Sequence, residues 1–251
     1  AGGCLVGLMS AFVNFYDKKD LKYNFVLAAT AEEEISGENG IAYMQPIMPK
    51  IDLAIVGEPT LLDLAIAEKG LIVFDLSIKG TASHAAHPND DNPLMKLPVL
   101  IKAIEDLHFE KVSPLLGPVK VTLTQIEAGS QHNVVPSEVN LVLDVRVNEC
   151  YTNEEIESII KSKLDCEVSA RSLRLKSSSI DPNHPLVLAG IALGKQTYGS
   201  PTLSDQAGLD CPSLKLGPGD STRSHSADEF IYLKEIEEGI SFYINLLKQI
   251  L

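Results

Sequence analysis

The chain has 251 residues and a formal net charge of −13; hydrophobic residues make up 45% of it and charged residues 22%. This composition is ordinary for a globular protein and argues against disorder or a fibrous repeat. The excess of acidic residues would repel a phosphate backbone, so we expect no nucleic-acid partner. The longest apolar runs fall far short of the roughly 20 residues that cross a bilayer, so we expect no membrane span.

The four cysteines are scattered along the chain, at Cys4, Cys150, Cys166 and Cys211. None of them forms the CxxC spacing of a zinc knuckle or a redox motif. We therefore expect reduced core thiols and a cytoplasmic protein.

The first part of the chain has an α/β pattern. Apolar residues at helical spacing predict a helix over residues 2–16, and continuous apolar runs predict buried strands over residues 23–30 and 53–56, with a Gly-rich helical stretch between them. Short buried strands that alternate with helices are typical of a mostly parallel sheet covered by helices. In such folds the active site lies at the carboxyl ends of the strands.

From Gly70 the pattern changes to longer alternating strands. The predicted order is β-α-β-β-α-β, a ferredoxin-like α+β arrangement, with strands or helices at 71–79, 93–107, 119–126, 138–147, from 153, and at 167–173. After it, we expect a helical stretch from Pro185, an apolar segment at 213–216 and a closing helix at 233–251. We therefore predict an inserted domain, residues 70–179, within a discontinuous catalytic domain formed by residues 1–69 and 180–251.

Carboxylates follow two of the predicted strands directly. Glu32, Glu33 and Glu34 come after the first strand, and Glu58 ends the second. Clustered like charges are costly unless a positive charge lies among them, and a divalent cation would supply one while leaving one Glu free as a general base. Taken singly, the Glu triplet also fits a solvated acidic turn, and Glu58 also fits a structural turn.

Two histidines lie in small, polar loops. His225 is in the loop that enters the last helix, where an imidazole beside carboxylates would suit zinc or a similar divalent ion. His84 lies in the inserted domain, and from there it could donate to a developing oxyanion if that domain closes over the site. Read alone, His225 is a helix cap or surface residue, and His84 is a surface loop residue.

Six segments resemble, in order, the motifs of a family of dinuclear metallohydrolases that contains acetylornithine deacetylase, succinyl-diaminopimelate desuccinylase and aminoacylase. The segments are residues 30–34, 56–60, 80–88, 133–136, 144–146 and 224–229. The resemblance covers almost the whole chain. Residues 67–70 and 217–225 look most like the acetylornithine deacetylases and their citrulline-specific relatives.

The resemblance implies a role for each acidic residue and for His225. Glu33 would be the general base, Glu34 and His225 would bind one metal ion, and Glu58 would bind the other. Two divalent ions, zinc or cobalt, would be the cofactors.

The resemblance also assigns residues of the inserted domain, which would act as a lid and as the module that forms a homodimer. His84 matches the lid histidine that stabilises the tetrahedral intermediate. Asn133 and Arg146 match positions that hold the polar groups and the carboxylate of the substrate. A guanidinium suits the second task because it pairs with a carboxylate through two parallel hydrogen bonds.

The expected reaction is metal-dependent hydrolysis of an N-acyl amino acid, with N-acetyl-L-ornithine, a substrate of arginine biosynthesis, as the first choice. N-acetyl- or N-succinyl-citrulline, succinyl-diaminopimelate and the free amine of an aminopeptidase substrate stay as alternatives. The family also supplies a metal-binding His and a metal-bridging Asp upstream of the helix that begins here at Ala1. This sequence has neither, so we expect a partial chain; the alternative is a non-catalytic paralogue or a dimerising fragment.

Overall fold

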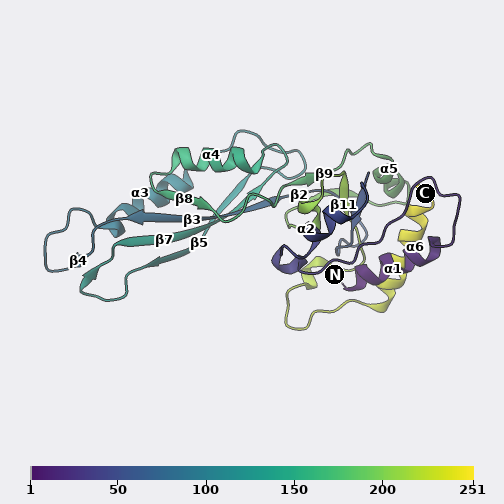
Figure 1. The fold of residues 1–251 in the computed structure, drawn as a ribbon, viewed down its shortest axis with the longest axis horizontal. Helices are drawn as coiled ribbons and strands as arrows, with labels where there is room; N and C mark the ends of the chain where they lie inside the picture. The colour runs from purple at the N-terminus through teal and green to yellow at the C-terminus, as the bar shows by residue number, and fades with distance from the viewer. Residues whose placement is uncertain (1) are drawn as a thin grey trace. The chain divides into compact units, whose positions relative to one another are not determined.

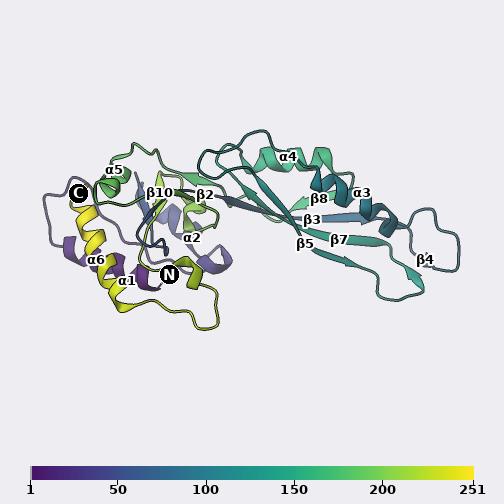
Figure 2. The ribbon, with the colours of Figure 1, turned by 180° about the vertical axis from the view of Figure 1, so that it is seen from behind.

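The computed structural model describes residues 2–251, which divide into two compact units (Figures 1 and 2). Unit 1 comprises residues 2–68 and 178–251, and unit 2 is Lys69–Ser177. The chain therefore leaves unit 1 after Glu68 and returns to it at Ser178. Each unit has a hydrophobic core of its own.

Unit 1 is built on a five-stranded mixed sheet. Its order is β1-β11-β2-β10, with β9 also paired to β2; the strands are β1 (Ala54–Val56), β2 (Leu64–Glu68), β9 (Ser178–Ser179), β10 (Thr197–Ser200) and β11 (Ser213–Lys215). The β1–β11 and β2–β10 pairs are parallel, whereas β11 and β9 both run antiparallel to β2. The α/β class is confirmed, and the sheet mixes both strand directions where a mostly parallel one was expected.

Helices cover this sheet and supply much of its core. The longer ones are α1 (Gly2–Phe15), α5 (Pro185–Ala192) and α6 (Leu233–Leu247), and shorter turns are α2 (Ile41–Met44), η1 (Glu33–Ile35), η2 (Gln45–Ile47), η3 (Asp205–Gly208) and η4 (Ser221–Arg223). Figure 1 shows α1 and α6 side by side, and Tyr243 of α6 is fully buried where they meet the sheet. Its hydroxyl donates to the carbonyl of Leu216, just after β11.

The predicted buried strand over residues 23–30 is wrong. The structure has no strand there, and Val26 keeps 43% of its surface exposed. A strand requires a neighbour that accepts and donates its backbone hydrogen bonds. No strand of residues 2–251 pairs with this segment, so its apolar sequence alone does not make it part of the sheet.

Unit 2 is built on an antiparallel sheet in the order β5-β7-β3-β8. The strands are β3 (Gly70–Lys79), β5 (Lys120–Ala128), β7 (Glu138–Val147) and β8 (Glu167–Ala170), with the short pair β4 (Ser83–His84) and β6 (Val134–Val135) beyond them. Alternate residues of β3 and β7 are buried, as in a sheet with one face covered.

Two helices pack on that covered face. Residues of α3 (Pro93–Glu105) and α4 (Asn153–Lys163) share one core with the buried side chains of β3 and β7, and Figure 2 shows both helices along the same side of the sheet. The hydroxyl of Thr152 accepts from the Glu155 amide, and Glu155 accepts from the Thr152 amide, so a capping box starts α4. The predicted β-α-β-β-α-β order is confirmed. No helix of residues 2–251 is long and apolar enough to cross a membrane.

Candidate functional site

The acidic turn is formed by Glu32, Glu33 and Glu34, and the three carboxylates differ in their hydrogen bonding. Glu32 has a left-handed backbone (φ 59°), and its carboxylate accepts hydrogen bonds of 3.0 Å from the amide and the side chain of Asn39. These bonds lower the pKa of Glu32 and close the loop. Glu33 and Glu34 follow in η1 and make no such closing bond, so they are the two carboxylates available for chemistry.

Glu58 and Lys215 lie at the ends of two strands that run side by side: Glu58 comes just after β1, and Lys215 is the last residue of β11. Strands β1 and β11 are parallel, with Val56 in register with Lys215, so the loop after β1 and the loop after β11 leave the same sheet edge. The two loops hold each other: the amide of Thr60 donates to the carbonyl of Gly217 at 3.1 Å. Gly217 has to be glycine, because a Cβ there would lie 2.7 Å from the carbonyl oxygen of Glu58.

The electrostatics of this edge favour the binding of a positive charge. Burial, together with the charges of Glu58, Glu34 and Asp205, raises the pKa of Glu33 to about 7. Burial also raises the pKa of Glu58, and Lys215 opposes both shifts. Burial is the largest cause of both shifts, and repulsion between the carboxylates adds to them, so a bound cation would relieve that repulsion.

His225 lies in a loop whose base is fixed to helix α6. Its backbone is left-handed (φ 57°), and its amide donates to Glu229 at 3.1 Å. Arg223 anchors the loop by donating to both carboxylate oxygens of Glu235 in α6, at 2.8 and 3.0 Å. The same guanidinium lies 5.1 Å from the ring centres of Phe230 and Tyr232, so the base of the loop is fixed while the imidazole stays exposed.

The structure brings Glu34 and His225 together. The Nε2 atom of His225 lies 3.7 Å from Oε2 of Glu34, with 80% and 68% of the two side chains exposed. An imidazole next to carboxylates fits zinc or a similar divalent ion in kind. Within residues 2–251, however, no three His, Cys, Asp or Glu side chains are close enough to hold a metal ion, so this pair supplies two donors only.

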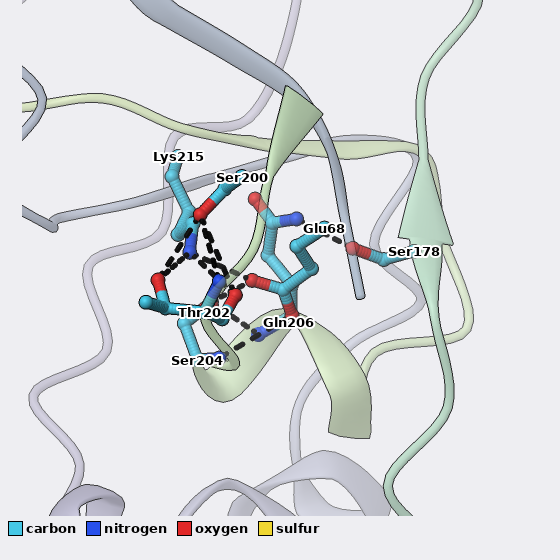
Figure 3. A network of polar contacts seen from close by, with 7 residues as sticks. All are labelled: Glu68, Ser178, Ser200, Thr202, Ser204, Gln206 and Lys215. Atoms are coloured by element: carbon cyan, nitrogen blue, oxygen red, sulfur yellow. Dashed lines mark hydrogen bonds and ion pairs between the residues drawn. The ribbon is translucent and has the colours of Figure 1, made fainter. Parts of the chain in front are cut away.

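A buried polar network lies beside the acidic turn, and sequence reasoning missed it (Figure 3). The Lys215 ammonium is 3.2 Å from Glu68 and also donates to the carbonyl and hydroxyl of Thr202, at 2.9 and 3.0 Å. Ser204 donates from its hydroxyl to Glu68 at 2.7 Å. A lysine within the apolar stretch 213–216 was the available signal, because a buried ammonium requires a buried partner.

The remaining predicted residues lie in unit 2. His84 is exposed in β4, opposite Val134 of β6, and its Nδ1 accepts from the amide of Ala86 at 3.1 Å. Asn133 is next to it, since its carbonyl accepts from the Ala85 amide at 2.9 Å. Arg146 lies in β7 and is already engaged by Asp144, through two hydrogen bonds of 2.8 and 2.9 Å.

The predicted residues thus form two groups. Glu33, Glu34, Glu58 and His225 belong to the sheet edge of unit 1, whereas His84, Asn133 and Arg146 belong to unit 2. Within unit 2, His84 belongs to the small β4–β6 pair, Asn133 directly precedes β6, and Arg146 is on the main sheet.

A known family matches the part of the chain that forms most of unit 2. Residues 66–170 match the family described as the peptidase dimerisation domain. Succinyl-diaminopimelate desuccinylases are also similar: that of Wolbachia pipientis is 26% identical over 87% of this chain and 61% of its own length. That of Helicobacter pylori is 26% identical over 99% of this chain and 70% of its own length. The chain therefore spans roughly three-fifths to seven-tenths of these two relatives.

Solved structures show the same fold. A metallo-carboxypeptidase of the M20 family from Sulfolobus solfataricus superposes with a TM-score of 0.74 at 17% identity, over 98% of this chain and 75% of that one. A tripeptidase from Staphylococcus aureus gives a TM-score of 0.68 at 20% identity, over 87% of this chain and 62% of that one. The chain has the α/β fold of the M20-family metallo-carboxypeptidase, and it is similar in sequence to the succinyl-diaminopimelate desuccinylases.

Proposed function

We propose that this chain carries the catalytic carboxylates and the lid of a metal-dependent amidohydrolase that cleaves the amide bond of an N-acyl amino acid. The observation that supports this most directly is the carboxylate group at the sheet edge of unit 1. There Glu33 has a pKa near neutrality and lies among Glu34, Glu58 and the exposed His225. A general base works best when its pKa is close to the operating pH.

Each residue of this edge has a part in the proposal. Glu34 and His225 would hold one divalent metal ion and Glu58 the other; when bound, such ions polarise the acyl carbonyl and make water a better nucleophile. Glu33 takes the proton of the attacking water and returns it to the leaving amine. A pKa of about 7 suits both steps, because near neutral pH Glu33 can accept a proton as a carboxylate and return it as a carboxyl group.

Residues of unit 2 act on the substrate in this proposal. His84 donates to the oxyanion of the tetrahedral intermediate, and Asn133 binds polar groups of the substrate. Arg146 binds the substrate carboxylate. Since its guanidinium is paired with Asp144 at 2.8 Å, binding there has to compete with that carboxylate or use the free edge of the guanidinium.

The acyl group and the amino acid are the finer part of the proposal. The similar relatives are named succinyl-diaminopimelate desuccinylases, which favours a succinyl group. The comparisons do not single out acetylornithine, the substrate that the sequence motifs favour. Zinc or cobalt as the metal, and a cytoplasmic location, are parts of the same proposal.

The test is amine release by the purified protein from N-succinyl-diaminopimelate, N-acetylornithine, N-acetylcitrulline and N-succinylcitrulline. Assays contain zinc or cobalt, with a chelator in parallel. Chelator-sensitive turnover of one substrate, lost in Glu33→Gln, supports the proposal and identifies the acyl group. No turnover of any substrate when metal binding has been demonstrated would leave the non-catalytic or the aminopeptidase alternative.

We also propose that unit 2 mediates a homodimer. Its sequence matches the peptidase dimerisation domain, and β5 is an edge strand of its sheet. Next to β5, helix α3 exposes an apolar stripe one turn long, with Met95 75% and Val99 74% exposed. An edge strand beside an apolar helix face is a surface that a second copy can cover.

Sedimentation equilibrium tests this surface. Met95→Glu combined with Val99→Glu should convert a dimer into monomers, because each carboxylate would be desolvated in the interface. Ser162→Glu on the exposed side of α4 is the matched control and should leave the mass unchanged. If the double variant sediments as the unaltered protein does, α3 is not in the interface.

A further inference from the structure

The chain passes between units 1 and 2 at two points, after Glu68 and before Ser178, which we call the crossings. We infer that Ser204, Asp205 and Gln206 are positioning residues that connect the two crossings to the turn that carries Glu33. The catalytic role of Glu33 rests on the proposed function. The connection itself is a property of unit 1, and it can be measured without any substrate.

Two of the three side chains hold the crossings. The hydroxyl of Ser204 donates to Glu68 at 2.7 Å, and Glu68 is the last residue before the chain enters unit 2. Gln206 donates from its side-chain amide to the hydroxyl of Ser178 at 2.5 Å, and Ser178 is the first residue after the chain returns. Figure 3 shows the contact of Ser204 with Glu68 and that of Gln206 with Ser178.

The third side chain holds the acidic turn. Asp205 accepts a hydrogen bond of 2.6 Å from the hydroxyl of Thr30, three residues before Glu33. Segment 23–30 has no strand partner in the described chain, so this bond is a tertiary contact that fixes its end. Asp205 also contributes to the raised pKa of Glu33, which agrees with the two carboxylates being near each other.

The local backbone explains how three consecutive residues reach three segments. Ser204 caps the 3-10 turn η3 by accepting from the amide of Gln206 at 3.3 Å. With about three residues per turn, the side chains of Asp205 and Gln206 in η3 point roughly 120° apart, and Ser204 precedes them as the extended N-cap. Ser204 is 5% and Gln206 1% exposed, so the turn is packed in place and cannot rotate to satisfy one contact without losing another.

A change in the hydrogen bonding at either crossing should therefore alter the order of the turn that carries Glu33, because the buried turn η3 contacts both. Ser178 makes its contact 28 residues before Gln206 in sequence, and Thr30 makes its contact 175 residues before Asp205. Loss of the Ser178 hydroxyl should therefore loosen residues 30–36, although Ser178 lies in β9 and is far from them in sequence.

Amide hydrogen exchange of the intact, metal-free protein, followed by mass spectrometry, tests the inference. Ser178→Ala and Ser204→Ala should each speed the exchange of residues 30–36 about fivefold, the factor expected for loss of one hydrogen bond. Thr30→Val should do the same directly, and Thr30→Ser, which keeps the donor, should restore slow exchange. Ser179→Ala, in the same strand as Ser178 but exposed, is the matched control.

Two outcomes would overturn the inference. The first is faster exchange in Ser178→Ala confined to residues next to the substitution; the second is an equal effect of Ser179→Ala. Urea unfolding of each variant shows that it is folded before exchange is measured. A protein that hydrolyses none of the proposed substrates can still give the expected exchange result, so failure of the function and failure of this inference are separable.

Discussion

Lys215 and Glu68 form an ion pair of 3.2 Å in which only 3% and 0% of the two side chains are exposed. Removing one partner of a buried pair leaves an uncompensated charge, which costs about 3–5 kcal/mol. Lys215→Met should therefore lower the free energy of unfolding by about that amount, measured by urea titration. Lys234→Met, which removes the exposed pair with Glu238, is the control; an equally small loss in both variants would contradict the burial argument.

The acidic turn predicts a pH dependence of stability. The pKa of Glu33 is raised from 4.5 to about 7, so between these values the folded chain keeps a proton that the unfolded chain has lost. The folded state binds more protons in this window, and its stability therefore falls as the pH rises through it. In Glu33→Gln this contribution is absent, so the unaltered protein should lose stability relative to the variant across the window. A difference between the two that does not change with pH would show that Glu33 is not perturbed.

Arg223 should control the mobility of the His225 loop. Arg223→Lys keeps the charge but loses the two parallel hydrogen bonds to Glu235 and the flat contact with Phe230 and Tyr232. Amides of residues 221–230 should then exchange about tenfold faster, as expected for a loss of roughly 1.5 kcal/mol. Lys234→Arg, an exchange of the same two residue types in the next helix, should leave the loop unchanged. Unaltered exchange in Arg223→Lys would show that the guanidinium is not the anchor.

The lid histidine gives a kinetic prediction. His84→Ala should lower kcat by about 10² to 10³, the usual effect of removing one donor to an oxyanion, with a smaller change in KM. His87, whose ring centre is 5.7 Å from that of His84, is the control because it shares the loop and its exposure. An equal loss in His87→Ala would mean that the loop, not the His84 imidazole, matters.

Local patterns were sufficient to predict unit 2 but not all of unit 1. In β3 and β7, fully buried residues alternate with less buried ones over ten positions each, so their sequence carries the period of a sheet with one covered face. Segment 23–30 has the composition of a buried strand, yet a strand also needs a partner, and the pattern of a segment holds no information about its neighbours. The same limit applies to the mixed sheet, because strand direction depends on connections that a local pattern does not show.

The sequence predicted that carboxylates would gather at the site, but it did not predict the contacts that each of them makes. Glu32 was grouped with Glu33 and Glu34, but its left-handed backbone and its bonds to Asn39 set it apart. Asp205 was missed because its contact with Thr30 joins positions 175 residues apart. No spacing rule reaches that far.

The pairing of Glu68 with Ser178 in β2 and β9 also bears on how the chain folds. Residues 69–177 form the connection between β2 and β9 of unit 1. Closing a loop of that length costs chain entropy. Within unit 2 the amide of Leu71 donates to the carbonyl of Leu175 at 3.0 Å, so folding of unit 2 alone brings both ends of the loop together. Formation of unit 2 first would turn a long closure into a short one, and nested assembly from the inside outwards is the order we expect. Pulse-labelling during refolding should show protection in β3 and β7 before protection in β2 and β9, and the reverse order would contradict it.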